Sequence, residues 1–304
     1  MSGTGGEAFD AERVLSGESG IVEGPRRRAR AWAADVADDA VAWATLAPLR
    51  VRRAAGRLPP RDVLVLGIYA PDGAAAMAQA VATLRESPHR VSFVLGALGE
   101  RDPALAEETM LGGLAGAGKF ENLNRLLAAI PATADWTLVI DDDVALPGGF
   151  LAGFLACAER FGLQLAQPAH RHASHAAWPV TRRARATLAR RTRLVEIGPV
   201  TAFHSSVAGA LLPFPPLRMG WGLDAHWGGL AAQRGWRLGV VDATPVRHHS
   251  RRPASNYDRS AAIAELADFL PGRPYVDRRA AGEVLERFRT LRGGGGSRSN
   301  ASHR

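Results

Sequence analysis

The chain has 304 residues, of which 46% are hydrophobic, and a formal net charge of +8 at pH 7. This length and apolar content suffice for one large domain or two small ones with a substantial core. The single cysteine, Cys157, excludes an intramolecular disulfide framework and fits a reducing compartment. The longest apolar stretch, near residues 150–158, is too short to span a bilayer, and residues 1–24 do not resemble a signal peptide. We therefore expect a soluble, cytoplasmic protein.

The positive charge is nearly all arginine, since Lys119 is the only lysine. Basic runs occur at residues 26–30, 182–193 and 251–252. A solvated surface is the simplest interpretation of each run, and the alternative is a partner that carries phosphates, such as a nucleotide or an anionic membrane touched peripherally. No zinc-finger spacing or aromatic-basic RNA motif is present, so no nucleic-acid partner is predicted.

The first elements in chain order favour an α/β fold. Residues 1–24 are polar, rich in glycine and without a period, which predicts disorder. Apolar residues at helical spacing, including Trp32, Val36 and Trp43, predict a helix over 28–56 within an extension that spans 25–60. A buried-type strand at 62–69, a helix and a second strand then form a β-α-β start, which favours a mostly parallel sheet with right-handed crossovers.

The rest of the chain continues the pattern as one domain over residues 61–275. The predicted elements are a helix at 73–85, a strand at 90–98, a loop at 99–118, helices at 119–130 and 149–161, strand candidates at 164–167 and 195–200 around a helical arginine-rich stretch, a helix at 223–234 and a strand at 237–242. A C-terminal helix at 276–292 and a disordered tail at 293–304 complete the prediction.

Three adjacent aspartates, Asp141, Asp142 and Asp143, end an apolar run of β-forming residues that starts at Trp136. Ligands of open α/β sheets bind outside the carboxyl ends of the strands. Adjacent carboxylates repel one another and are costly near a core unless a cation compensates them. Because side chains alternate along a strand, Asp141 and Asp143 point to the same side and can share one hard divalent ion. A turn or a helix N-cap would explain one aspartate, but explains three much less well.

A glycine-rich segment from Gly113 to Lys119 spells G-x-x-x-x-G-K, as in a P-loop. We reject a P-loop because Phe120 stands where a hydroxyl should hold magnesium. Lys119 begins the following helix, where it is either a solvated cation or a contact to a phosphate. Asn124 lies at the border of the buried face of that helix, where a polar side chain needs a partner in the backbone or a ligand.

The segment Gly220-Trp221-Gly222-Leu223-Asp224 is a second candidate site. The glycines permit a close approach of backbone and ligand, and Trp221 offers a flat apolar surface. Asp224 falls at a helix start, where it is either an N-cap or a general base facing an acceptor hydroxyl.

Histidines supply further candidate ligands. His248 and His249 follow the late strand, and a neutral imidazole suits a metal that carboxylates already hold. His170, His172 and His175 approach the H-x-H-x-D-H pattern of metallo-hydrolases, but a serine stands in place of its aspartate.

Taken in order, these pieces resemble the nucleotide-sugar-dependent glycosyltransferases of the GT-A fold. The matching features are a β-α-β start, a helix that opens with Gly-Lys-x-x-x-Leu-Asn at 118–124, the acidic motif, the Gly-Trp-Gly-Leu-Asp segment and a late histidine. Residues 62–258 are covered, and the second half is closest to a plant and bacterial domain family of unknown function. That narrower likeness includes Glu196, to which no role is assigned. The resemblance implies a single GT-A-like, Rossmann-like α/β domain.

The resemblance also implies roles for individual residues. Asp141, Asp143 and His248 would hold Mn²⁺ or Mg²⁺ against the diphosphate of a nucleotide sugar, and Asp224 would deprotonate the acceptor, with inversion at the sugar. Donor contacts are expected from Lys119, Asn124, Asp142, Trp221 and Gly222. The first strand departs from the family in ending Tyr69-Ala70-Pro71-Asp72, so the nucleotide base is not predicted, and the acceptor is unknown. A catalytically silent binding module, or a metal-dependent nucleotidyltransferase or hydrolase, are the alternatives.

Overall fold

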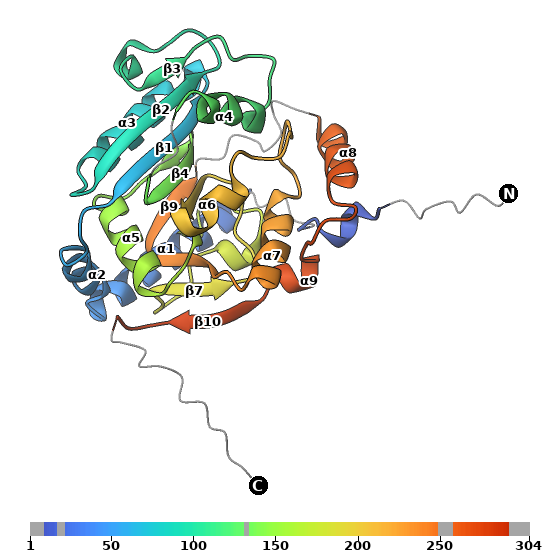
Figure 1. Ribbon diagram of the computed structural model, residues 1–304. Coiled ribbons are helices and arrows are strands. Elements are labelled where there is room, and N and C mark those ends of the chain that lie inside the picture. The colour runs from blue at the N-terminus through green and yellow to red at the C-terminus, as the bar shows by residue number, and fades with distance from the viewer. Residues whose placement is uncertain (1–8, 17–21, 131–133, 249–257, 292–304) are drawn as a thin grey trace, which may run out of the picture.

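A computed structural model describes residues 9–16, 22–130, 134–248 and 258–291, and these form a sheet flanked by helices (Figure 1). In spatial order the strands are β10 (Val284–Phe288), β7 (Ala189–Thr192), β9 (Leu238–His248), β6 (Leu165–His170), β8 (Val200–His204), β4 (Trp136–Asp141), β1 (Asp62–Tyr69), β2 (Arg90–Ala97) and β3 (Thr109–Leu111), and β5 (Val144–Ala145) pairs with β9. The α-helices are α1 (Pro25–Ala44), α2 (Ala47–Ala55), α3 (Ala74–Arg85), α4 (Lys119–Ala128), α5 (Phe150–Arg160), α6 (Ser205–Leu211), α7 (Leu223–Arg234), α8 (Arg259–Phe269) and α9 (Arg278–Ala281).

The half of the sheet from β4 to β3 is parallel and brings strand ends to one edge. β1 pairs in parallel with β2 and with β4, and the last pairs in these registers are Tyr69 with Ala97 and Ile68 with Asp141. β1 is an almost continuous run of buried residues, as expected for a strand covered on both faces. The carboxyl ends of β1 and β4 therefore meet at the same edge, where the acidic motif begins.

The other half of the sheet is mixed. β8 is antiparallel to β4 and to β6, while β6 is parallel to β9. β9 continues past Asp242 as far as His248, where it pairs with the short strand β5. This extension carries a histidine from one half of the sheet to the acidic turn of the other.

Helices cover both faces of the sheet with apolar side chains. On one face the core includes Met77 of α3 and Phe154 of α5, and on the other it includes Leu123 of α4 and Trp227 of α7. All four side chains are at most 2% exposed. Burial of a large apolar side chain contributes about 1.5–3 kcal/mol, so these two layers fix the strand ends that carry the polar groups.

Several predicted elements are confirmed and others are wrong. β1 and α7 have the predicted bounds, and the α/β class is confirmed. The arginine-rich stretch at 182–193, predicted to be helical, instead contains β7. The strand candidate at 195–200 overlaps the actual strand β8 only at Val200, and the predicted helix at 276–292 is the short helix α9 followed by β10.

The predicted helix at 28–56 is two helices, α1 and α2, separated at Leu46, which has a left-handed backbone conformation with φ of 53°. Part of the predicted N-terminal disorder is also wrong, because residues 11–13 form a 3-10 turn and Val14 is buried. Residues 1–8, 17–21 and the predicted tail at 293–304 lie outside the described residues. Among the residues that are described, no helix has the length and apolarity needed to cross a membrane.

Candidate active site

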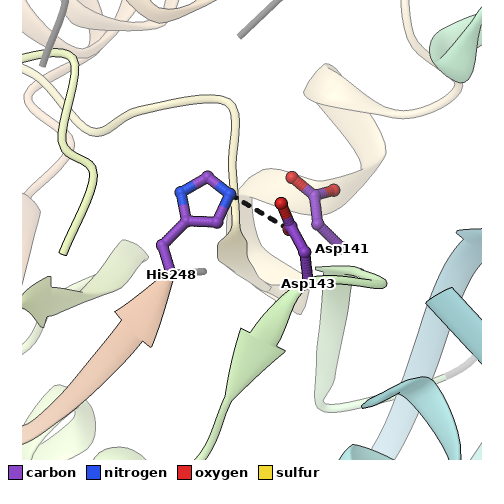
Figure 2. A group of neighbouring side chains, drawn as sticks. All are labelled: Asp141, Asp143 and His248. Carbon is purple, nitrogen blue, oxygen red and sulfur yellow. Dashed lines mark ion pairs between the residues drawn. The ribbon is translucent and has the colours of Figure 1, made fainter. Parts of the chain in front are cut away.

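The acidic turn and the end of β9 bring three ligand-type side chains together. Asp141 ends β4, Asp143 lies in the turn to β5, and the pairing of Val144 with His248 aligns β9 beside that turn. One ligand atom from each of Asp141, Asp143 and His248 lies within 4.8 Å of the other two. Figure 2 shows the three side chains side by side, with a dashed line for the ion pair of His248 and Asp143. The distance from His248 Nε2 to Asp143 Oδ1 is 3.0 Å. We call these three residues the metal triad.

The metal triad has the chemistry of a divalent cation site. Two carboxylates and one imidazole suit Mn²⁺ or Mg²⁺, and the imidazole favours a transition metal such as Mn²⁺ over Mg²⁺. Burial acts to lower the pKa of His248, but the carboxylates of Asp143 and Asp141 outweigh it and hold this pKa above its usual value. The protonated imidazole thus supplies part of the positive charge that the two carboxylates require. The residues present fit the ion that the sequence predicts.

Lys119 supplies the other nearby positive charge. Its Nζ lies 2.5 Å from Asp141 Oδ1 and donates to the carbonyl oxygen of Ile197 at 3.1 Å. It belongs to the first turn of α4, beside the predicted metal ligands. Gly198 passes close by: a Cβ at this position would lie 2.5 Å from Asp141 Oδ2 and 3.3 Å from Lys119 Nζ. The absence of a side chain there leaves room for these two groups.

Asp142, the middle residue of the acidic motif, points back into the fold. Its Oδ2 accepts a hydrogen bond of 2.7 Å from the backbone N–H of Ala70, directly after β1. The carboxylate also packs against Gly73, where a Cβ would lie 2.0 Å from the same oxygen. Asp142 therefore fixes the turn after β1 against the turn after β4, and its predicted contact with the donor remains a prediction.

Asp224, the predicted base, sits in the first turn of α7 and is partly buried. Its Oδ2 accepts a hydrogen bond of 3.0 Å from the indole Nε1 of Trp178, and its Oδ1 accepts one from its neighbour Ala225. Burial raises the pKa of Asp224 to about 6, helped by the nearby charge of Glu196 and opposed by these hydrogen bonds. A carboxylate with a pKa near 6 is ionised at neutral pH and more basic than an ordinary aspartate, which suits a general base.

Glu196 links the surroundings of Asp224 to those of the metal triad. Its buried carboxylate accepts from the backbone N–H of Trp178 at 3.0 Å and from the hydroxyl of Thr181, and it lies 3.6 Å from His170 Nε2. Burial raises the pKa of Glu196 above its usual value. No role for Glu196 is predicted from the sequence; an acid inside the apolar run Val195-Glu196-Ile197 was the available signal. No local pattern indicated Trp178.

The three hydrolase-like histidines do not all come together in the structure. His170 and His175 lie beside His248, with ring centroids at 6.2 and 5.3 Å from it, and burial lowers the pKa of His175 to about 4. His172 instead pairs with Asp38 of α1 at 3.0 Å. The three do not form a metal group among the described residues, and His249 lies outside them.

The remaining residues that are predicted to contact the donor make contacts within the protein. The side-chain amide of Asn124 is engaged with Phe214, accepting from its N–H at 2.8 Å and donating to its carbonyl at 2.9 Å. The backbone partner considered for Asn124 is thus the one found. Gly222 has φ of 91° and packs on α8, and Trp221 lies under the guanidinium of Arg259 at 5.9 Å. Donor contacts of Trp221 and Gly222 remain predictions.

Comparisons with known proteins find similar folds but no similar sequences. No protein-family model and no curated protein matches the chain.

Among solved structures, S. aureus TarS 1-349 in complex with UDP-GlcNAc is similar with a TM-score of 0.51 and 12% identity, over 67% of this chain and 64% of that one. A mannosyltransferase from Pyrobaculum calidifontis in complex with GDP-Man and Mn²⁺ gives a TM-score of 0.45 at 17% identity, over 76% and 70% of the two chains. GalNAc-T7 with UDP, GalNAc and Mn²⁺ gives 0.49 at 12%, over 85% and 61%. The chain thus spans a little under two thirds of the length of the TarS fragment, and what the two share is the GT-A type of fold.

Proposed function

We propose that the protein is a metal-dependent glycosyltransferase that moves a sugar from a nucleoside-diphosphate donor to an acceptor hydroxyl, with inversion at the sugar. The observation that carries the proposal is the metal triad at the carboxyl ends of β4 and β9, in a GT-A-type fold. The TarS structure of this fold holds UDP-GlcNAc, which is a donor of this class.

The triad and Lys119 account for binding of the diphosphate. Asp141, Asp143 and His248 would hold Mn²⁺ or Mg²⁺, which neutralises negative charge on a departing diphosphate. Lys119 is at the start of α4 and within reach of the same place, so its ammonium group would contact a phosphate oxygen. Asp142 would support both by fixing the turn after β1.

Asp224 would accept the proton of the acceptor hydroxyl as that oxygen attacks the sugar carbon and the bond to the diphosphate breaks. Trp178 and the N–H of Ala225 orient the carboxylate, and Glu196 holds the backbone of Trp178. Attack from the side opposite the leaving group gives inversion.

Donor binding and turnover test the proposal separately. Isothermal titration of nucleoside diphosphates and their sugars, with and without Mn²⁺, should identify one donor whose binding requires the ion. Asp143→Asn should weaken that binding by at least about tenfold because the negative charge of an anionic ligand is lost. Asp62→Asn, which alters an exposed ion pair with Arg90 outside the site, is the matched control and should bind as the native protein does.

The alternatives predict other results. Metal-dependent donor binding without turnover on any acceptor would identify a silent binding module, and release of pyrophosphate rather than nucleoside diphosphate would identify a nucleotidyltransferase. Donor binding that is unchanged in Asp143→Asn would contradict the proposed metal site.

A further inference from the structure

The N-terminal helix α1 packs on the domain through its acidic side. Asp35 and Asp38 are only 2% and 3% exposed. The carboxylate of Asp35 accepts from the backbone N–H groups of His172 and Ala173 at 2.8 and 3.1 Å, and Asp38 pairs with Arg185 Nε at 2.6 Å. A helix on a protein surface usually turns its apolar side to the core and its charged side to water. In α1 the acidic side faces the protein.

The apolar side of α1 is exposed. Trp32, Val36 and Trp43 are 61%, 47% and 60% exposed, and at 100° per residue they lie within about 40° of one another around the helix. Leu46 and Leu49, which are 51% and 40% exposed, follow at the start of α2. We call these five residues the α1–α2 apolar face. Of the six large hydrophobic side chains exposed in the described part of the chain, five belong to it. Such clustering marks an interaction surface.

Positive charge flanks this face along the chain. Among residues 22–57 the acids are Glu23 and the three aspartates that face the domain, at positions 35, 38 and 39. The exposed arginines are Arg26, Arg27, Arg28, Arg30, Arg50, Arg52, Arg53 and Arg57. Tryptophan beside arginine on a helix that lies at the surface is the composition of interfacial membrane segments, where the indole sits at headgroup level and the guanidinium meets lipid phosphates.

We propose that the α1–α2 apolar face docks on an anionic lipid bilayer. The two tryptophans and the aliphatic side chains enter the interface, and the arginines bind the headgroups. The arginine run at 182–193, which the sequence also offered for this role, does not support the proposal, because Arg183, Arg185 and Arg190 pair with aspartates of the same chain.

The docking face adjoins the elements that carry the metal triad. An open pocket of about 390 Å³ lies between Trp32 and Val36 of α1 and Ala145 and Arg247 of the β5–β9 pair. Arg247 directly precedes His248. A bilayer bound at α1 would therefore lie next to the strands that position the triad. This placement, which rests on the proposed function, implies an acceptor that is presented at a membrane surface.

Vesicle binding tests this inference independently of the proposed function, since it needs neither donor nor metal. We would measure co-sedimentation of the full chain with phosphatidylcholine vesicles, with and without about a third of phosphatidylglycerol. The expected result is binding only to anionic vesicles, weakened by salt, and reduced by more than about tenfold in the double variant Trp32→Ser/Trp43→Ser. Leu285→Ser removes an exposed apolar side chain on β10 and should bind as the native protein does.

Three outcomes would overturn the inference. The native protein could fail to bind anionic vesicles at low salt, or the double tryptophan variant could bind them as well as the native protein does. Light scattering could instead show that the native protein is a dimer and the double variant a monomer, which would make the face a contact between copies of the chain. Because both tryptophans are exposed, the variant should keep the native melting temperature, and that measurement separates lost docking from lost folding.

Discussion

Asp224 has a local environment that predicts the pH dependence of the reaction. Burial is the main cause that raises its pKa to about 6, and a general base must be ionised to accept a proton. We expect kcat/KM to rise with pH through about 6 and to level above it. Asp224→Asn should lower kcat by about 10²–10⁴-fold and leave donor affinity unchanged. A pH–rate profile of the native protein and the variant checks both predictions. If kcat/KM of the native protein instead levelled off above about pH 4, Asp224 would be excluded as the titrating base.

The same carboxylate has a predictable effect on stability. A carboxyl whose pKa is higher in the folded than in the unfolded chain costs stability above the folded pKa and costs none below the unfolded pKa. The shift from 3.8 to about 6 corresponds to at most about 3 kcal/mol, and partial exposure reduces this to roughly 1–2 kcal/mol. Asp224→Asn should therefore be more stable than the native protein at pH 7, with the difference disappearing near pH 4. Urea unfolding at the two pH values measures it, and destabilisation at pH 7 would contradict it.

At the scale of elements, the turn that leads into α7 depends on a glycine for two separate reasons. Gly220 has φ of 79°, and a Cβ there would lie 2.1 Å from the ring of Phe120 in α4. Gly235, at the other end of α7, has φ of 69° but no atom within 4 Å of such a Cβ. We expect Gly220→Ala to cost more than about 2 kcal/mol and Gly235→Ala about 1 kcal/mol, since only the first adds a steric clash to the backbone strain. Chemical denaturation of the two variants compares them, and equal losses would contradict the argument.

Local sequence patterns predicted the elements whose surroundings are simple. β1 is buried on both faces and reads as an unbroken apolar run, and α7 lies between glycines that mark its ends. β7 could not be predicted in this way because arginine is usually exposed. In β7 the guanidinium of Arg190 is buried against Asp242 of β9, at 2.8 Å, and only the tertiary fold supplies that partner.

The candidate site was predictable to a similar extent. Asp141 and Asp143 follow from strand alternation, and His248 from its place after the late strand. Their meeting depends on the length of β9 and on its pairing with β5, which the sequence did not indicate. Trp178 reaches Asp224 from a loop distant in sequence, so its part in orienting the carboxylate has no local signature.

At the scale of the whole molecule, α1 is connected to the metal triad through one short segment. The carboxylate of Asp35 accepts hydrogen bonds from the N–H groups of His172 and Ala173. The hydroxyl of the next residue, Ser174, accepts one from the backbone N–H of His248 at 2.7 Å. The helix that carries the docking face therefore also supports the segment that positions a predicted metal ligand. Contiguous packing of this kind can couple two sites, but the coupling must be measured.

Removal of the Asp35 carboxylate measures that coupling. Asp35→Ala removes the acceptor of two part-buried N–H groups and should cost about 1–3 kcal/mol of folding free energy. Because the segment next to His248 then loosens, Mn²⁺ affinity should fall severalfold, although Asp35 does not belong to the metal triad. Asp62→Ala, which breaks an exposed pair with Arg90, should change neither quantity appreciably. Urea unfolding and Mn²⁺ titration of both variants provide the measurement. If Asp35→Ala were destabilised but bound Mn²⁺ with native affinity, α1 would be an extension fastened to the domain with no influence on its metal site.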